Sequence, residues 1–266
     1  MKRSRFLPGI VVGVVLLAAL ASYVFNPYRQ IPIHEASDPR YWILVMKGLD
    51  KYDYHNGLLQ RGDTSVPEVA LTIDDGPDPR YEPAIVQILK QNDIPATFFV
   101  IGIRIKQHPE LIKLLKDNGF EIGNHTYDHQ RLDALKPHEI ANELRLCDSH
   151  IFAVTGEHPH LMRPPGVQYD DKVLGVAKSM GYVTVSWTVG AKDYEKVSAA
   201  FITQRVLDKT GNGAIILLHQ DNPETAQALP GIIATLKSRG YKFVTISQML
   251  QRLNAKLPTA DVNSGQ

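Results

Sequence analysis

The sequence predicts an α/β fold, a distorted or incomplete barrel of about seven parallel strands with helical connections, preceded by an N-terminal apolar helix. Two observations carry this prediction. From residue 69 onward, short apolar runs of strand length alternate with segments whose apolar residues recur at helical spacing. About seven such units follow one another in roughly 180 residues, which fits an incomplete barrel better than an open doubly wound sheet.

The strands are predicted where β-branched and other apolar residues cluster between turn formers. Val69, Leu71 and Ile73 form the first run, and Gly76 and Pro77 end it. In chain order the predicted strands are 69–73, 96–101, 120–123, 160–162, 182–187, 214–218 and 241–246.

The helices are predicted where apolar residues recur every three or four positions. Ile85, Ile88 and Leu89 show this spacing in the first helix. A glycine directly follows several of these segments, as Gly119 does, and ends the helix. In chain order the predicted helices are 84–92, 109–118, 137–154, 171–180, 198–209 and 225–239.

The start of the chain has the pattern of a targeting signal. Three basic residues come first, Lys2, Arg3 and Arg5, and an apolar run covers 6–25. A run of about twenty residues can span a bilayer as a helix, and the preceding positive charges predict a cytoplasmic N-terminus. Ala19-Leu20-Ala21 also fits a cleavage site, so residues 1–26 are either a signal anchor, which we favour, or a removable signal peptide. Both place the rest of the chain outside the cytoplasm, at the membrane or secreted.

The remaining segments divide the chain further. Residues 27–67 are predicted to be a linker with a packing arm, in which Leu58-Leu59 makes an apolar contact before a turn. The main domain covers 68–255, and the polar tail 256–266 is predicted to be disordered.

Composition narrows the classes of function. The chain has 266 residues, 44% hydrophobic and 21% charged, which is typical of a globular domain with a sizeable core. A formal net charge of +1 gives no sign of a nucleic-acid partner, and no obligate protein partner is evident. The single cysteine, Cys147, excludes an internal disulfide and a cysteine-rich metal site.

Reactive side chains follow the predicted strands at the point where each ends. Because the carboxyl ends of parallel barrel strands meet on one face, we expect these side chains to share one site. They are Asp74 and Asp75, His125 and His129, Arg163, Asp193, and His219.

Two of these histidines predict a metal site. His125 and His129 are four residues apart and share one side of the chain if the loop begins a helical turn. With Asp75 they would make a site of two imidazoles and one carboxylate that leaves positions open for water and substrate. The alternative is a pair of surface histidines, since the chain has ten.

Five short motifs in this order resemble those of the polysaccharide deacetylases, the NodB-homology domain or carbohydrate esterase family four. Thr72–Gly76 is similar to Thr-Phe-Asp-Asp-Gly, and His125–His129 matches His-Ser/Thr-x-x-His. Arg163-Pro164-Pro165 matches the start of Arg-Pro-Pro-Tyr-Gly, although Gly166 and Val167 replace the last two residues. Asp193-Tyr194 stands at the place of Asp-Trp, and Leu217–His219 matches Leu-x-His. The resemblance covers roughly residues 69–250.

This resemblance implies a role for each residue. Asp75, His125 and His129 would bind a divalent ion, with Zn²⁺ favoured over Co²⁺, Mn²⁺ or Ni²⁺. Asp74, beside Arg163, would be the general base, and His219, oriented by Asp193, the general acid. The Gly166 N–H would stabilise the oxyanion, and the small acetyl pocket would be bordered by Tyr194 and Leu217. The loss of the motif's tyrosine at Gly166 bears on the substrate more than on the reaction.

The expected function is therefore metal-dependent hydrolysis of N-acetyl groups on peptidoglycan or a chitin-like glycan outside the cytoplasm. Two alternatives stay open, an esterase for O-acetyl groups and a catalytically silent wall-binding protein on the same fold. The presence of both an acid and a base favours catalysis, because a pure binder needs neither.

Overall fold

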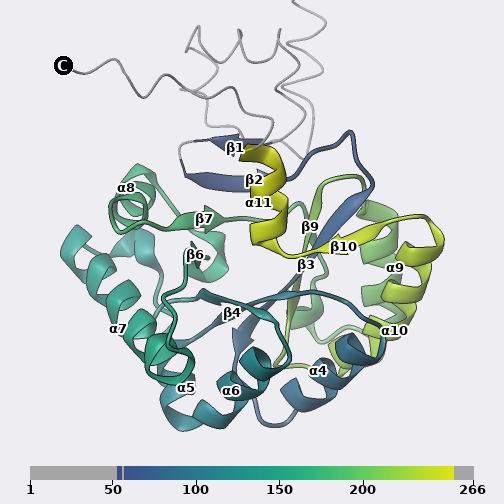
Figure 1. Cartoon of the computed structure of the whole chain (residues 1–266), viewed down its shortest axis with the longest axis horizontal. Helices are drawn as coiled ribbons and strands as arrows, with labels where there is room; N and C mark the ends of the chain where they lie inside the picture. Colours follow the sequence, from purple (N-terminus) through teal and green to yellow (C-terminus); the bar gives the residue numbers. More distant parts are fainter. Residues whose placement is uncertain (1–52, 56, 255–266) are drawn as a thin grey trace, which may run out of the picture. The chain divides into compact units, whose positions relative to one another are not determined.

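The computed structural model describes residues 53–55 and 57–254 (Figure 1). The predicted leader 1–26, most of the predicted linker and the predicted tail 256–266 lie outside the described residues. Within the described residues, no helix combines the length and the apolar character needed to cross a membrane.

One curled sheet of ten strands forms the centre of the described part, in the order β1-β2-β7-β6-β5-β4-β3-β9-β8, with β10 also paired to β3. All pairings are parallel except that of β1 with β2. The strands are β1 Asp53–His55, β2 Leu58–Arg61, β3 Glu68–Gly76, β4 Thr97–Val100, β5 Glu121–Asn124, β6 Leu161–Met162, β7 Val183–Val185, β8 Val189–Gly190, β9 Ala214–His219 and β10 Lys242–Val244. The predicted incomplete parallel barrel is confirmed, and every predicted strand is present.

Strand β3 is central to this sheet because it pairs with three other strands, β9 on one edge and β10 and β4 on the other. Strand β9 pairs with it from Val69 to Asp74. The other edge is shared, since β10 pairs with the first half of β3 and β4 with the second. Side chains alternate along a strand, so Leu71 and Ile73 pack toward the helices while Ala70 packs inside the curl. Asp74 shares the inner side with Ala70.

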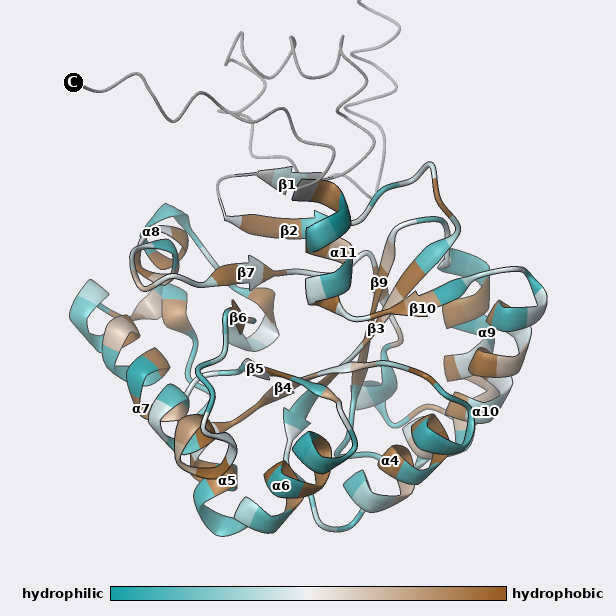
Figure 2. Cartoon of the chain, in the orientation of Figure 1, coloured by the Kyte–Doolittle hydropathy of each residue, from teal (hydrophilic) through white to brown (hydrophobic). Residues whose placement is uncertain are grey.

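Helices α4 to α10 line the outside of the sheet, whereas α11 packs against the inner cluster (Figure 1). They are α4 Glu82–Gln91, α5 Gly102–Gln107, α6 Pro109–Asp117, α7 Pro137–Thr155, α8 Asp171–Ser179, α9 Ala199–Lys209, α10 Pro223–Ser238 and α11 Ile246–Asn254. Figure 2 shows hydrophobic strands and helices that are hydrophobic on one side only. The six predicted helices are all present, whereas α5 and α11 were not predicted.

The β1–β2 hairpin extends the sheet where the sequence predicted only a packing arm. Strand β2 pairs with β7, and Leu59 is fully buried in the inner core cluster. The Gly62 N–H donates to the Gly213 carbonyl at 2.8 Å. Gly213 has a φ of 72°, and a Cβ there would lie 2.5 Å from the Gly62 oxygen, so only glycine fits.

Candidate active site

The two adjacent aspartates at the end of β3 point in different directions. Asp74 follows the regular alternation of the strand and faces inward. Asp75 has a left-handed φ of 69°, and the pairing of β3 with β4 is irregular between Ile73 and Gly76. A positive φ is uncommon for a residue with a side chain, and here it separates the two carboxylates.

Three ligand atoms converge at this point. Asp75 Oδ1 lies 3.2 Å from Nε2 of His125 and 3.1 Å from Nε2 of His129. The three ligand atoms all lie within 4.8 Å of one another. Asp75 Oδ1 is buried and accepts no hydrogen bond of good geometry. Two imidazole nitrogens facing an unsatisfied carboxylate oxygen form a donor set that fits a divalent cation.

His125 is fixed in the orientation that a metal ligand needs. Its ring is buried, and Nδ1 donates to the Arg163 carbonyl at 2.8 Å, which leaves Nε2 facing Asp75. Burial opposes a charge on the ring, yet the carboxylates of Asp74 and Asp75 raise the pKa of His125. Burial also opposes a charge on Asp75, but its contacts with His125 and His129 hold the pKa of that carboxyl well below its usual range. This charge pattern favours a cation between the three side chains.

The loop that carries both histidines is irregular, not the helical turn considered from spacing alone. Thr126 and His129 have positive φ values of 69° and 67°. Glu143 of α7 holds the loop, because its Oε2 accepts the backbone N–H groups of Tyr127 and Asp128 at 3.0 and 3.1 Å. Sequence reasoning missed this residue. A signal existed, since Glu143 lies on the otherwise apolar buried side of α7.

Asp74 is paired with a fully buried arginine. Arg163 Nη1 donates to Asp74 Oδ1 at 2.7 Å and to Thr72 Oγ1 at 2.8 Å. The other guanidinium nitrogens, Nε and Nη2, donate to the carbonyls of Val185 and Ser186. Asp74 Oδ2 lies 3.8 Å from Nε2 of His125. One carboxylate oxygen is thus held by Arg163 while the other faces His125, one of the three candidate metal ligands.

A second pair joins His219, at the end of β9 next to β3, to the buried Asp193 of the short helix Asp193–Glu195. Asp74 and His219 are register partners in these two strands. His219 Nδ1 lies 2.8 Å from Asp193 Oδ1, and Asp193 Oδ2 accepts the His219 backbone N–H at 2.7 Å and the Thr225 hydroxyl at 2.8 Å. Burial opposes protonation, but the bond to Asp193 and its charge raise the pKa of His219 to about 9. The free Nε2 can therefore carry a proton at neutral pH.

The residues expected to border the substrate lie beside this pair or on a separate loop. Tyr194 is 60% exposed, and its ring meets that of His219 edge to face with centroids 5.5 Å apart. Leu217 is buried and precedes His219 by two positions on β9, so it shares the same side of the strand. Gly166 is exposed and left-handed, with a φ of 60°. Among the described residues, no hydrogen bond joins Gly166 to the three candidate metal ligands.

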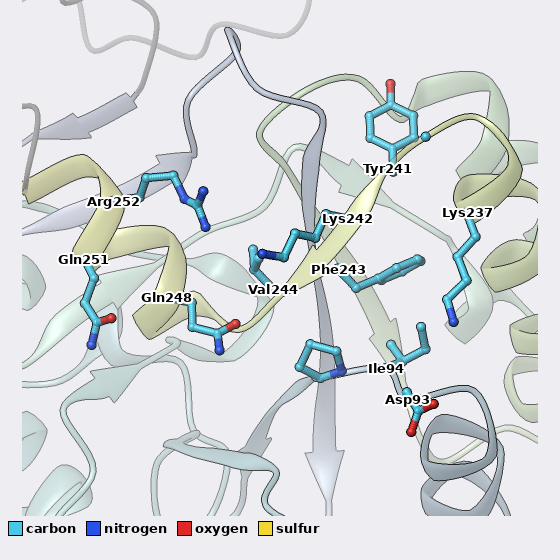
Figure 3. A pocket seen from close by; sticks show the side chains of 12 residues that line it. Asp93, Ile94, Lys237, Tyr241, Lys242, Phe243, Val244, Gln248, Gln251 and Arg252 are labelled. Carbon is cyan, nitrogen blue, oxygen red and sulfur yellow. The ribbon is translucent and has the colours of Figure 1, made fainter.

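A sizeable hollow lies elsewhere in the described part of the chain. It has a volume of about 910 Å³ and is lined by segments that include β10 and α11 (Figure 3). Strand β10 pairs with Glu68–Ala70 at the start of β3, whereas Asp74 and Asp75 stand at its end. This hollow is therefore at the opposite ends of the strands from the candidate site.

Comparison with known proteins decides the family. The profile of the polysaccharide deacetylase family matches residues 61–185. The chain is 38% identical over 188 residues to a peptidoglycan-N-acetylglucosamine deacetylase of Bacillus cereus, which covers 69% of this chain and 88% of that protein. The chain belongs to the polysaccharide deacetylase family. This confirms the resemblance seen in the five motifs, and the chain is accordingly a polysaccharide deacetylase.

Two further members of the polysaccharide deacetylase family bear on the function of this chain. The peptidoglycan-N-acetylmuramic acid deacetylase PdaA of Bacillus subtilis is 32% identical over 215 residues, 79% of this chain and 80% of that protein. The crystal structure of BA3943 from Bacillus anthracis, a family pseudoenzyme, has 31% sequence identity and a TM-score of 0.71, and covers 77% of this chain and 79% of that one. Because the fold occurs both in deacetylases and in a pseudoenzyme, catalysis by this chain has to be inferred from its side chains and not from its fold.

Proposed function

We propose that this deacetylase hydrolyses N-acetyl groups of peptidoglycan. One observation carries the proposal. Asp74 and His219 are register partners on neighbouring strands beside the three candidate metal ligands. Each contacts a fully buried side chain of charge opposite to its own ionised form, Arg163 for Asp74 and Asp193 for His219. A base and an acid on two sides of one reacting group are what amide hydrolysis needs. Relatives acting on N-acetylglucosamine and on N-acetylmuramic acid support peptidoglycan over a chitin-like glycan.

The metal would be held by Asp75, His125 and His129, and we favour Zn²⁺ because the set contains two imidazoles and one carboxylate. A bound ion supplies Lewis-acid chemistry, which polarises the acetamide carbonyl and makes water more acidic.

The side chains of this chain perform the proton transfers. Asp74, held by Arg163 through Oδ1, accepts a proton from the attacking water through Oδ2. As the C–N bond breaks, His219 gives its Nε2 proton to the sugar nitrogen, and Asp193 stabilises the charged ring before that step. The products are acetate and a free amine. Tyr194 and Leu217 flank His219 and would border the acetyl group.

We also propose that the enzyme works outside the cytoplasm, held by a single N-terminal anchor with its N-terminus inside. The supporting features are the basic start and apolar run of residues 1–26 and the extracytoplasmic position of peptidoglycan. Protease added to intact spheroplasts should digest the catalytic domain. Full protection would overturn this topology.

An O-acetyl esterase remains the second candidate, because the same groups could attack an ester carbonyl. The test is to incubate the metal-loaded protein with peptidoglycan, chitooligomers and acetylated xylan, and to follow acetate and the mass of the products. We expect peptidoglycan sugars lighter by one acetyl group and carrying a new amine. Release only from xylan would establish the esterase, and release from none would establish a silent protein.

A further inference from the structure

A buried pair that the proposed mechanism does not use lies beside the end of β3. Glu82 is the first residue of α4, and Gln220 directly follows His219. Both are 0% exposed, and Gln220 Nε2 donates to Glu82 Oε2 at 2.9 Å.

The polar atoms of this pair are one donor short. Glu82 Oε1 and Gln220 Oε1 are both buried and have no hydrogen-bond partner in the described part of the chain. An ionised Glu82 would leave a buried charge that only neutral groups stabilise, the Gln220 amide and the Asp78 backbone N–H, at a cost of several kcal/mol. A proton on Glu82 Oε1 would supply the donor that Gln220 Oε1 lacks. Exchanging the amide nitrogen and oxygen of Gln220 would bring two acceptors together and require the same proton.

The surrounding charges do not favour ionisation. The acidic groups that act on Glu82 are Asp78, in the loop before α4, and Glu110 of α6. The nearby cations are engaged elsewhere, since Arg80 pairs with Asp78 and Arg104 donates to the Asp75 carbonyl. Across from Glu82, the segment after β9 presents the neutral amide of Gln220. Burial raises the pKa of Glu82 to about 7.

The Glu82–Gln220 pair can fix the position of the segment that carries Asp74 and Asp75 relative to His219 at the end of β9. The backbone N–H of Gln220 donates to the backbone carbonyl of Asp74 at 3.3 Å. The Gln220 amide is packed against Gly76, where an added Cβ would lie 2.0 Å from Nε2. Gln220 thus touches the segment that carries Asp74 and Asp75, and is itself the neighbour of His219.

We propose that Glu82 is protonated in the working enzyme and forms a carboxylic acid–amide pair with Gln220, which positions the end of β3 against the end of β9. Both are positioning residues, since neither touches the reacting atoms. The effect on catalysis rests on the proposed function, whereas the protonation state does not. The pair stabilises the fold fully below about pH 4.5, the ordinary pKa of glutamate, and this contribution is lost as pH rises through about 7.

Glu82→Gln is the informative variant, because its amide is neutral and can donate to Gln220 Oε1 at every pH. Glu157→Gln is the matched control, since it removes a negative charge from a side chain that is 80% exposed and lies outside the pair. Wild type and both variants, as full-length metal-loaded chains, are unfolded with urea between about pH 5 and pH 9. We expect the Glu82→Gln midpoint to equal that of wild type near pH 5 and to exceed it above pH 8, while Glu157→Gln follows wild type.

A Glu82→Gln midpoint below that of wild type by the same amount at every pH would show an ionised Glu82 and overturn the proposal. Carbon-13 NMR of the wild-type chain labelled at glutamate carboxyls tests the same point if the variant does not fold. A signal titrating near pH 7 supports the pair, and the absence of any such signal contradicts it. In the deacetylation assay, Glu82→Gln should keep the wild-type KM and retain more of its kcat above pH 8. If the chain releases no acetate at all, the proposed function fails while the unfolding comparison still decides the state of Glu82.

Discussion

Asp193 binds His219 twice, through Oδ1 to the ring Nδ1 at 2.8 Å and through Oδ2 to the backbone N–H at 2.7 Å. This double contact fixes the ring and leaves only Nε2 to exchange protons. Because the carboxylate raises the pKa of His219 to about 9, the protonated ring that we propose as the general acid is present at neutral pH and is lost as pH rises through that value.

Replacing Asp193 with asparagine should therefore move the alkaline limb of the kcat/KM profile to lower pH. We expect a shift of about 1–2 pH units, because the anionic partner of His219 is removed while the side-chain shape is kept. The measurement compares the pH profiles of wild type and Asp193→Asn at equal metal content. An unmoved alkaline limb would leave Asp193 a structural role only and would remove the support for His219 as the acid.

The metal site makes a separate prediction. His125→Ala and His129→Ala each remove one of three ligands, so metal affinity should fall by more than about 100-fold and activity should nearly vanish. Metal content after dialysis, measured by atomic emission, checks this. His138→Ala is the control, since His138 is exposed on α7 and is not one of the three candidate ligands. Unchanged metal in both ligand variants would refute the site.

The Asp74–Arg163 pair predicts non-additive stability. Arg163 is fully buried, so Arg163→Met leaves Asp74 without its cation and should cost about 3–5 kcal/mol of unfolding free energy. Adding Asp74→Asn removes the unpaired charge and should restore part of that loss. Urea unfolding of both single variants and the double variant gives the coupling. Simple addition of the two single losses would mean that the pair is not coupled.

The hairpin predicts a stability effect at a residue outside the candidate catalytic and metal-binding set. Leu59 of β2 is fully buried in the inner core, so Leu59→Ala should cost about 2–5 kcal/mol. Ile103→Ala is the control, because that side chain is 40% exposed and should change stability by no more than about 0.5 kcal/mol. Equal small effects would show that β2 does not belong to the cooperative core.

The parts of the fold that the sequence predicts are those with long enough patterns. Strand β3 and helix α7 have several apolar residues at the right spacing, and both were found within a few residues of their predicted bounds. Strand β8 has two residues and α5 has six, too few for a period to show. Helix α11 does have a longer pattern, because Ile246, Met249, Leu250 and Leu253 recur at helical spacing and are all buried, although no helix was predicted there.

The candidate site divides in the same way. Asp74, Asp75 and His219 are readable because each stands at a strand end, and parallel strands bring such ends together. Glu143 and Glu82 escape this reasoning because each stands on a helix and not at the end of a strand. The positive φ of Asp75, which turns its carboxylate toward the histidines, depends on the pairing of β3 with β4 and has no local sequence signal.

We propose that Asp74 is the general base of a metal-dependent deacetylase. The most direct measurement is acetate release from peptidoglycan by wild type and by Asp74→Asn, each with its metal content determined in the same sample. We predict that wild type releases acetate and an equal amount of new amine, while Asp74→Asn binds as much metal and loses at least about 100-fold in kcat. Comparable acetate release by fully metal-loaded Asp74→Asn would contradict the assignment of Asp74 as the general base.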